Sequence, residues 1–325
     1  MTTMLLIRRI SLQIVAAASC GIALMACGEK SPQSLSLAIT DWPGYEYFYL
    51  ASKRNLDLKS NLRLKVHQFS SLEDQRRAFI RGDVEAIATT LSESIAICRQ
   101  SVSRCPVIVL VLDESHGADQ LIASSGFSTV AQLRGKRIGL ERSDLGEYMA
   151  FRAFQTAGIS LDQVNLVYAG PRKLIDLLSQ NNVDAIVSYP PHVDFLKDPK
   201  KWNVLFSSSD IPGEIVDVLA VSPSLSRDQS VVKRLVDIWW SARDLWRQDP
   251  AGSSAVMAKR QGITAEQFQA NQKWIAYPGR IDQQSLLAPN GGVESTLQKI
   301  KLQLLQTGLH GSEVTLPRVA DPDRR

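Results

Sequence analysis

The sequence predicts an α/β protein made of two related lobes, and three observations lead to this expectation. Short apolar segments typical of buried strands alternate with amphipathic, helix-like segments along most of the chain, which favours parallel or mixed sheets covered by helices. The stretches 82–89 and 181–188 share a pattern: a predicted helix ends, an acidic residue precedes a short apolar strand, and hydroxyl residues follow. The chain has 325 residues, enough for two domains of ordinary size.

The first 26 residues differ from the rest and resemble an export signal. A pair of arginines precedes an uncharged, largely apolar stretch that ends at Ala26, the pattern of a signal peptide. This stretch is short for a membrane span, which needs about 20 apolar residues. The run LMAC at 24–27 is similar to the lipobox of bacterial lipoproteins, which implies lipidation of Cys27 after removal of 1–26. Residues 27–34 then form the lipidated end and a polar tether. An ordinary signal peptide without lipid is the alternative.

Strand and helix signals follow in order along the mature chain. Residues 62–67 alternate apolar and polar side chains, as a half-buried strand does. Ser71 to Asp74 resembles a capping box and opens a helix that ends at Gly82. Further strands are expected at 107–112, 138–140, 185–187 and 216–221, and helices at 147–157, 172–180 and 231–247.

The charge balance gives no sign of a nucleic-acid partner. The chain has 37 basic and 33 acidic residues, and loss of Arg8 and Arg9 with the signal leaves 35 against 33. No basic run of the kind that binds phosphates occurs.

Two cysteines remain after Cys20 leaves with the signal and Cys27 takes the lipid. Cys98 and Cys105 either pair, as thiols outside the cytoplasm often do, or stay free. Their spacing fits no common zinc motif, and we expect no metal site.

Motifs for catalysis are missing from the sequence. It contains no phosphate loop, no dinucleotide-binding fingerprint, no GxSxG and no HExxH. The four histidines are scattered along the chain. We expect no catalytic residues and no cofactor, although a triad assembled in space would not be visible in sequence.

Polar and aromatic residues recur just after the predicted strands. Residues 40–47 (TDWPGYEY) follow the first strand, Thr90 follows a strand at 86–88, and 113–119, Ser143 and Tyr189 follow later ones. In open α/β sheets ligands bind beyond the carboxyl ends of strands, where helix N-termini offer free N–H donors. Each residue alone is as well explained as a turn, a cap or a core side chain. Their recurrence at equivalent places favours one shared cleft.

Six segments carry a resemblance to one family. They are DWPGYEYFYLA, AFIRGDVEAIATT, DESHGADQLIAS, VAQLRGKRIGLERSDLGEY, NNVDAIVSYPP and SSDIPGEIVDVLAV. In this order and spacing they resemble the nitrate/sulfonate/taurine-type (SsuA/THI5-like, NMT1-like) substrate-binding proteins of ABC importers, over nearly all of 35–310. A thiamine-pyrimidine synthase is a relative, but the Cys-rich segment of such enzymes is missing.

The resemblance implies a periplasmic-binding-protein type II fold, with two α/β lobes joined by a two-crossover hinge. Its lobes would be 35–117 and 118–218, with 219–317 returning to the first lobe and adding C-terminal helices. Residues 318–325 would form a flexible tail. The positions that match the ligand cleft of the family are Trp42, Tyr45, Thr90, Ser115, Ser143 and Tyr189, and Asp113, Asp119 and Asp217 match acidic positions in its motifs.

The function implied is that of an extracytoplasmic, lipid-anchored monomer that captures a small polar organic molecule. A membrane permease and its ATPase would be its partners. A ligand-sensing module for a membrane signalling protein, or an enzyme on the same fold, are the alternatives. The loops after the strands contain several acids and only one arginine, Arg142. We therefore expect a ligand with an amine, which balances buried carboxylates, and with an acidic group near Thr90 and Ser143.

Overall fold

The structure, a computed structural model, describes residues 31–306 and 314–320, and its first sheet draws strands from both ends of the chain. Five of these strands lie in the order β2-β1-β3-β10-β4. Strand β1 is parallel to β2 and β3, whereas β10 is antiparallel to β3 and β4. Two short strands, β11 and β12, pair with β4. The strands are β1 (Gln33–Ile39), β2 (Leu62–Gln68), β3 (Ala86–Thr90), β4 (Val107–Ser115), β10 (Val216–Val221), β11 (Ile275–Ala276) and β12 (Arg318–Val319).

The second sheet repeats the same order and directions with the middle of the chain. Its order is β7-β6-β8-β5-β9, with β6 parallel to β7 and β8, and β5 antiparallel to β8 and β9. The two echoing stretches lead into β3 and β8, which hold the central position of each sheet. The strands are β5 (Gln120–Ser124), β6 (Arg137–Leu140), β7 (Asn165–Tyr168), β8 (Ala185–Ser188) and β9 (Trp202–Ser207).

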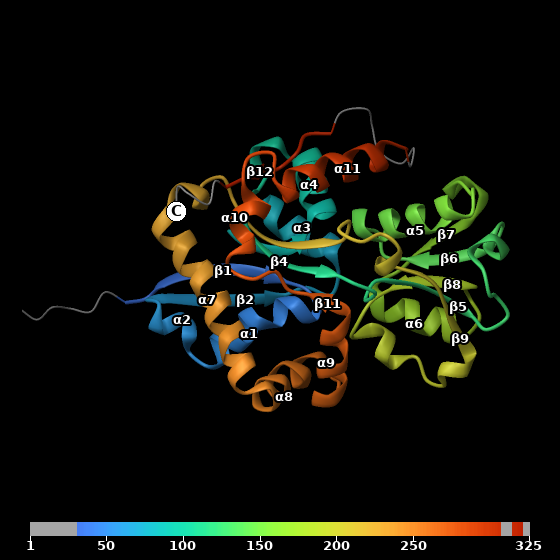
Figure 1. The fold of residues 1–325 in the computed structure, drawn as a ribbon, viewed down its shortest axis with the longest axis horizontal. Helices are drawn as coiled ribbons and strands as arrows, with labels where there is room; N and C mark the ends of the chain where they lie inside the picture. Colours follow the sequence, from blue (N-terminus) through green and yellow to red (C-terminus); the bar gives the residue numbers. More distant parts are fainter. Residues whose placement is uncertain (1–30, 307–313, 321–325) are drawn as a thin grey trace, which may run out of the picture. The chain divides into compact units, whose positions relative to one another are not determined.

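Helices cover both faces of each sheet (Figure 1). Helices α3, α4, α10 and α11 lie over one face of the first sheet, and α1, α7 and α8 over the other. Helix α7 buries Val231, Leu235, Ile238 and Trp239, a helical spacing that presents one apolar stripe to the core. The helices are α1 (Glu46–Lys53), α2 (Leu56–Lys59), α3 (Leu72–Arg81), α4 (Leu91–Gln100), α5 (Asp144–Thr156), α6 (Pro171–Ser179), α7 (Gln229–Gln248), α8 (Pro250–Gln261), α9 (Ala265–Asn271), α10 (Asp282–Leu287) and α11 (Gly292–Gln306).

The chain crosses between the sheets twice, from β4 to β5 and from β9 to β10. Hydrogen bonds join the two crossovers: Ser115 Oγ lies 2.8 Å from Ser208 Oγ, and the Gly117 N–H donates to Ser208 Oγ at 2.7 Å. Gly117 has φ +104°, and a Cβ there would lie 2.8 Å from Ser209 Oγ. Glycine is therefore required at this turn.

Two predicted boundaries are wrong. The return to the first sheet was expected at Leu219, but β10 starts at Val216, because the whole apolar run 216–221 pairs with β3 and β4. The tail was expected to be free from Arg318, but Arg318–Val319 pairs with β4, and Val319 packs against the core. Residues 321–325 lie outside the described residues.

Cys98 and Cys105 form a disulfide, which joins the end of α4 to the segment before β4. The expected signal peptide and the lipid site at Cys27 lie outside the described residues. Within the described part of the chain, no helix is both long enough and apolar enough to cross a membrane.

Candidate functional site

One enclosed hollow is lined by residues from corresponding ends of the two sheets. Thr40 follows β1 and Thr90 ends β3, while Tyr189 follows β8 in the second sheet. Strands β10 and β5 run antiparallel to these neighbours, so they start at the same edges, and Asp217 and Asp119 lie at those starts. The residues that line the hollow are Thr40, Trp42, Leu72, Thr90, Asp119, Leu145, Tyr189, Ile215 and Asp217.

The hollow is closed and small. Its volume is about 10 Å³, near the smallest that holds one water molecule. The rings of Trp42 and Tyr189 meet edge to face, with centroids 6.0 Å apart. An organic ligand therefore enters this place only if the two sheets move apart or the lining side chains turn away.

Three buried carboxylates lie at or just behind the hollow. Asp113, Asp119 and Asp217 are each at most 2% exposed. Burial raises the pKa of Asp119 to about 6 and the pKa of Asp113 to about 7, because a charge is disfavoured away from water. The pKa of Asp217 is raised further, by burial and by the negative charge of Asp113. Asp113 and Asp217 lie opposite each other on the paired strands β4 and β10, so each disfavours the charge of the other.

The opening motif DWPGY holds this pair of acids in place. The Trp42 indole donates to Asp113 Oδ1 at 2.9 Å, and the Tyr45 hydroxyl donates to Asp217. A Cβ at Gly44 would lie 2.0 Å from Asp113 Oδ2. Glycine at position 44 is therefore needed for Asp113 to approach the backbone this closely.

Two helix N-termini at the hollow receive carboxylates from the opposite sheet. The Leu72 N–H, in the first turn of α3, donates to Glu141, which follows β6. The Leu145 N–H, in the first turn of α5, donates to Glu93 of α4 at 3.2 Å. Arg99 of α4 also binds both carboxylate oxygens of Asp144, at 2.8 and 2.9 Å. These contacts link the two halves across the hollow.

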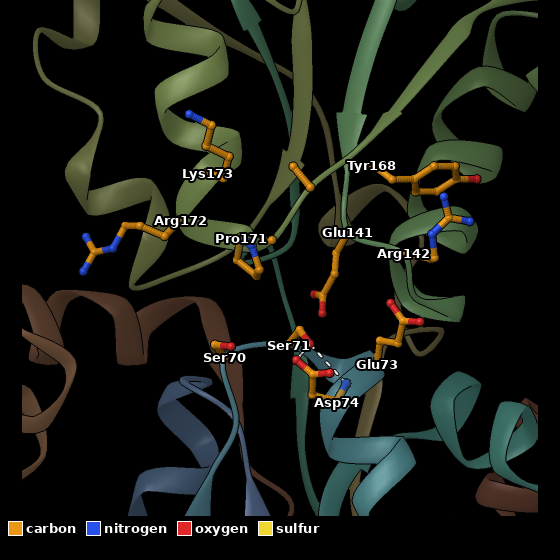
Figure 2. A pocket seen from close by; sticks show the side chains of 12 residues that line it. Ser70, Ser71, Glu73, Asp74, Glu141, Arg142, Tyr168, Pro171, Arg172 and Lys173 are labelled. Atoms are coloured by element: carbon orange, nitrogen blue, oxygen red, sulfur yellow. Dashed lines mark hydrogen bonds between the residues drawn. The ribbon is translucent and has the colours of Figure 1, made fainter.

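A larger groove lies on the other side of Glu141. It has a volume of about 470 Å³ and is lined by residues from 70–74, 141–142 and 168–173. In Figure 2, Glu141 points into the groove from the second sheet, toward Ser71 and Glu73 of the first half. Burial raises the pKa of Glu141 to about 8. Besides the buried Glu141, the groove is lined by Glu73 and Asp74 on the side of α3 and by the exposed Arg142, Arg172 and Lys173 on the other side, so its charges are mixed in sign.

The structure brings five of the nine predicted contacts to the hollow, namely Trp42, Thr90, Asp119, Tyr189 and Asp217. The other four lie behind it. Tyr45 and Asp113 form the second layer described above, and Ser115 joins the crossovers. The Ser143 hydroxyl caps α5 by accepting from the Gly146 N–H.

Sequence reasoning missed Leu72, Leu145, Ile215 and Glu141, and it included Thr40 only as part of the stretch 40–47. Leu72 and Leu145 each follow closely on a capping serine, and an apolar residue there is an ordinary core signal. Glu141 could have been found, because it directly follows the predicted strand 138–140, as the other candidate residues follow their strands. In the structure it is 5% exposed. Within the described residues, no cluster of His, Cys, Asp and Glu is placed to hold a metal.

The chain belongs to the NMT1/THI5-like family, whose sequence profile matches residues 43–244. A candidate binding protein of Brucella abortus is 25% identical over 155 residues, 46% of this chain and 49% of that protein. A candidate aliphatic sulfonates-binding protein of Escherichia coli is 23% identical over 44% of each chain. The matched segments thus span about half the length of these curated relatives.

Solved structures confirm the fold. The alkanesulfonate-binding protein SsuA from Xanthomonas axonopodis pv. citri, bound to MOPS, superposes with a TM-score of 0.76 at 15% identity, covering 89% of this chain and 99% of that one. The desulfurization enzyme DSZB superposes with a TM-score of 0.61 at 14% identity, covering 87% and 95%. The predicted periplasmic-binding-protein fold, with two mixed α/β sheets, is therefore correct. The fold alone does not separate binding from catalysis.

Proposed function

We propose that the protein is an extracytoplasmic solute-binding protein, which captures a small polar organic molecule between its two sheets and delivers it to an ABC importer. The observation that carries the proposal is the hollow, which both sheets line at the corresponding ends of their strands. Ligands of open α/β sheets bind at this edge. The family and the sulfonate-binding relatives support the same reading.

Capture requires the two halves to open and close, because the hollow has no room for an organic molecule as it stands. The crossovers at 116–119 and 208–215 are the only covalent links between the sheets within the described chain, so they form the hinge. The bonds from Glu141 to Leu72, from Glu93 to Leu145 and from Arg99 to Asp144 form on closure. They shape the closed surface that a permease would recognise.

Lipidation of Cys27 would keep the binder next to its importer, since multiple acyl chains hold a protein firmly on a membrane. In the intact cell, Cys27→Ala should leave the protein uncleaved or release it from the membrane fraction. Unchanged detergent-phase partitioning of this variant would contradict the anchor and leave solute binding untouched.

Native mass spectrometry of the freshly purified chain from residue 28 tests the central proposal. We expect a small molecule to co-purify with the protein. Ile215→Phe, which fills the hollow, should remove it, whereas Ala169→Phe, which fills the groove instead, should not. Circular dichroism checks that both variants fold. Loss of the adduct in the groove variant alone would contradict the assignment, and chemical conversion of the molecule by the protein would favour an enzyme.

A further inference from the structure

We propose that the solute is a small organic cation, with its ammonium group on Asp119 and Asp217 and its apolar part against Trp42 and Tyr189, and that the site disfavours sulfonates and other anions. This inference rests on the proposed function, because it takes the hollow as the solute site. It goes further by assigning the charge of the solute.

The hollow presents two carboxylates, one from each sheet, and no cation. Its nine lining residues include Asp119 and Asp217 but no Lys or Arg. Among the described residues, neither aspartate forms an ion pair with a basic side chain. The cation Arg243 lowers the pKa of Asp113, but it donates to the Tyr47 hydroxyl at 2.7 Å and stacks on Tyr277. A buried carboxylate without a positive partner is costly, and a cationic solute would supply that partner on closure.

Two of the donors that an anion could use are already occupied. The N–H groups of Leu72 and Leu145, at the N-termini of α3 and α5, donate to Glu141 and Glu93. A sulfonate at either helix end would have to displace the side chain that accepts there, and at α5 it would break a contact of Glu93, which is also ion-paired with Arg76.

Two hydroxyl groups near the hollow serve as helix caps. Thr90 Oγ1 accepts from the Glu93 N–H at 3.1 Å and lies 2.8 Å from Ser92 Oγ. The Ser143 hydroxyl accepts from the Gly146 N–H. Capping holds both oxygen atoms against the backbone of their own helices, so the case for the charge of the solute rests on the two aspartates.

The rest of the lining suits an organic cation. The Trp42 indole and the Tyr189 ring border the same space, and aromatic faces attract desolvated cations. Leu72, Leu145 and Ile215 complete an apolar wall for a short hydrocarbon part. Asp119, whose pKa is about 6, carries the negative charge at neutral pH, while Asp217 offers further oxygen atoms.

Two measurements test the inference. First, the charge of any co-purified molecule is read by mass spectrometry of the denatured extract, where a cation is expected. Second, calorimetry compares n-butylammonium, 1-butanol and 1-butanesulfonate, which share a four-carbon chain. We expect n-butylammonium to bind at least tenfold more tightly than 1-butanol, and 1-butanesulfonate to bind least.

Asp119→Asn should reduce the affinity for n-butylammonium at least tenfold and leave 1-butanol within twofold. Asp184→Asn is the matched control. Asp119 lies next to the C-terminal end of β8, whereas Asp184 precedes the N-terminal end, so this variant removes the same charge away from the hollow, where Asp184 binds Arg137. It should leave all three affinities within twofold. For the wild-type protein, n-butylammonium affinity should rise about tenfold from pH 5 to pH 7 as Asp119, facing Asp217, Asp113 and Tyr189, ionises.

A co-purified anion or neutral molecule, preference for 1-butanesulfonate, or an unchanged preference in Asp119→Asn would overturn the cation assignment and leave the solute-binding proposal standing. If no probe binds and no molecule co-purifies, the proposed function fails, and the inference fails with it.

Discussion

The hollow and the groove lie on two sides of Glu141, and they differ in every property that matters for recognition. The groove is large, about 470 Å³ against about 10 Å³. Apart from the buried Glu141, its charged side chains are at least partly exposed and are mixed in sign, so they are screened and hydrated. The hollow is small because it is closed, and its acids and rings are buried. The comparison teaches that in a hinged protein the volume of a cavity depends on how far the halves have closed, whereas buried acids and aromatic rings contributed by both sheets identify the candidate site.

Replacing Trp42 should have the largest effect and tests the importance of the hollow. Trp42→Ala removes a buried ring and the indole donor to Asp113, which is 0% exposed. We expect a loss of about 3–5 kcal/mol in the free energy of unfolding, together with loss of solute binding. Urea unfolding and calorimetry measure the two effects. A variant with normal stability and normal solute affinity would show that Trp42 contributes neither to folding nor to solute binding.

Removing the disulfide should change stability without changing solute binding, because Cys98 and Cys105 line neither the hollow nor the groove. The double variant Cys98→Ala, Cys105→Ala should lose about 2–3 kcal/mol of unfolding free energy, as expected for a closed loop of this length. Solute affinity should stay within twofold. Wild-type protein unfolded under reductant serves as control and should match the variant. A clear change in affinity would mean that α4 transmits strain to the hollow through the Arg99 contact with Asp144.

The pH dependence of stability tests the role of Glu141 between the two cavities. Its folded pKa of about 8 lies above its usual value of 4.5, so between these values the folded state binds more protons than the unfolded state. Stability therefore falls as pH rises from 5 to 8, by at most about 1.4 kcal/mol per unit from this group.

Glu141→Gln keeps an acceptor for the Leu72 N–H and should flatten this fall by about 3 kcal/mol between pH 5 and 8. Asp184→Asn is the control: an ion pair with Arg137 lowers the pKa of Asp184, so its contribution is lost only below pH 5. Urea unfolding at each pH gives the slopes. An identical slope in wild type and Glu141→Gln would show that the carboxylate ionises freely in the groove.

The smallest effect is expected for the groove itself. Arg142 is exposed and stacks on Tyr168, with its guanidinium 4.0 Å from the ring centroid. Arg142→Ala should cost about 0.5 kcal/mol of stability or less, since exposed cation–π contacts are weak. Solute affinity should stay within twofold. A tenfold loss of affinity would reverse the comparison and make the groove the binding site.

Local patterns in the sequence were enough to predict most of the elements. The alternation at 62–67 became β2, the capping residues at 71–74 became the start of α3, and the apolar run at 107–112 became β4. These signals are local, because burial and capping depend on neighbours a few residues apart. The predicted lobe boundary at 218/219 and the start of the tail at Arg318 were wrong, because Val216 and Arg318 both pair with β4, which is distant in the sequence.

For the site, the sequence by itself determined which strand ends carry polar and aromatic groups, and its resemblance to the family added the individual positions. Of these nine positions, Trp42, Thr90, Asp119, Tyr189 and Asp217 line the hollow. Only the tertiary structure decided which of the predicted side chains remain free to contact a solute. Ser143 and Thr90 were taken as anchors for an acidic group, but the folded chain uses them as caps. Glu141 and Glu93 reach the helix ends of the opposite half only when both sheets are in place. Hydrogen-bond partners from residues 50 or 70 positions away leave no pattern in a single sequence, because the contact depends on the geometry of two sheets and not on spacing along the chain.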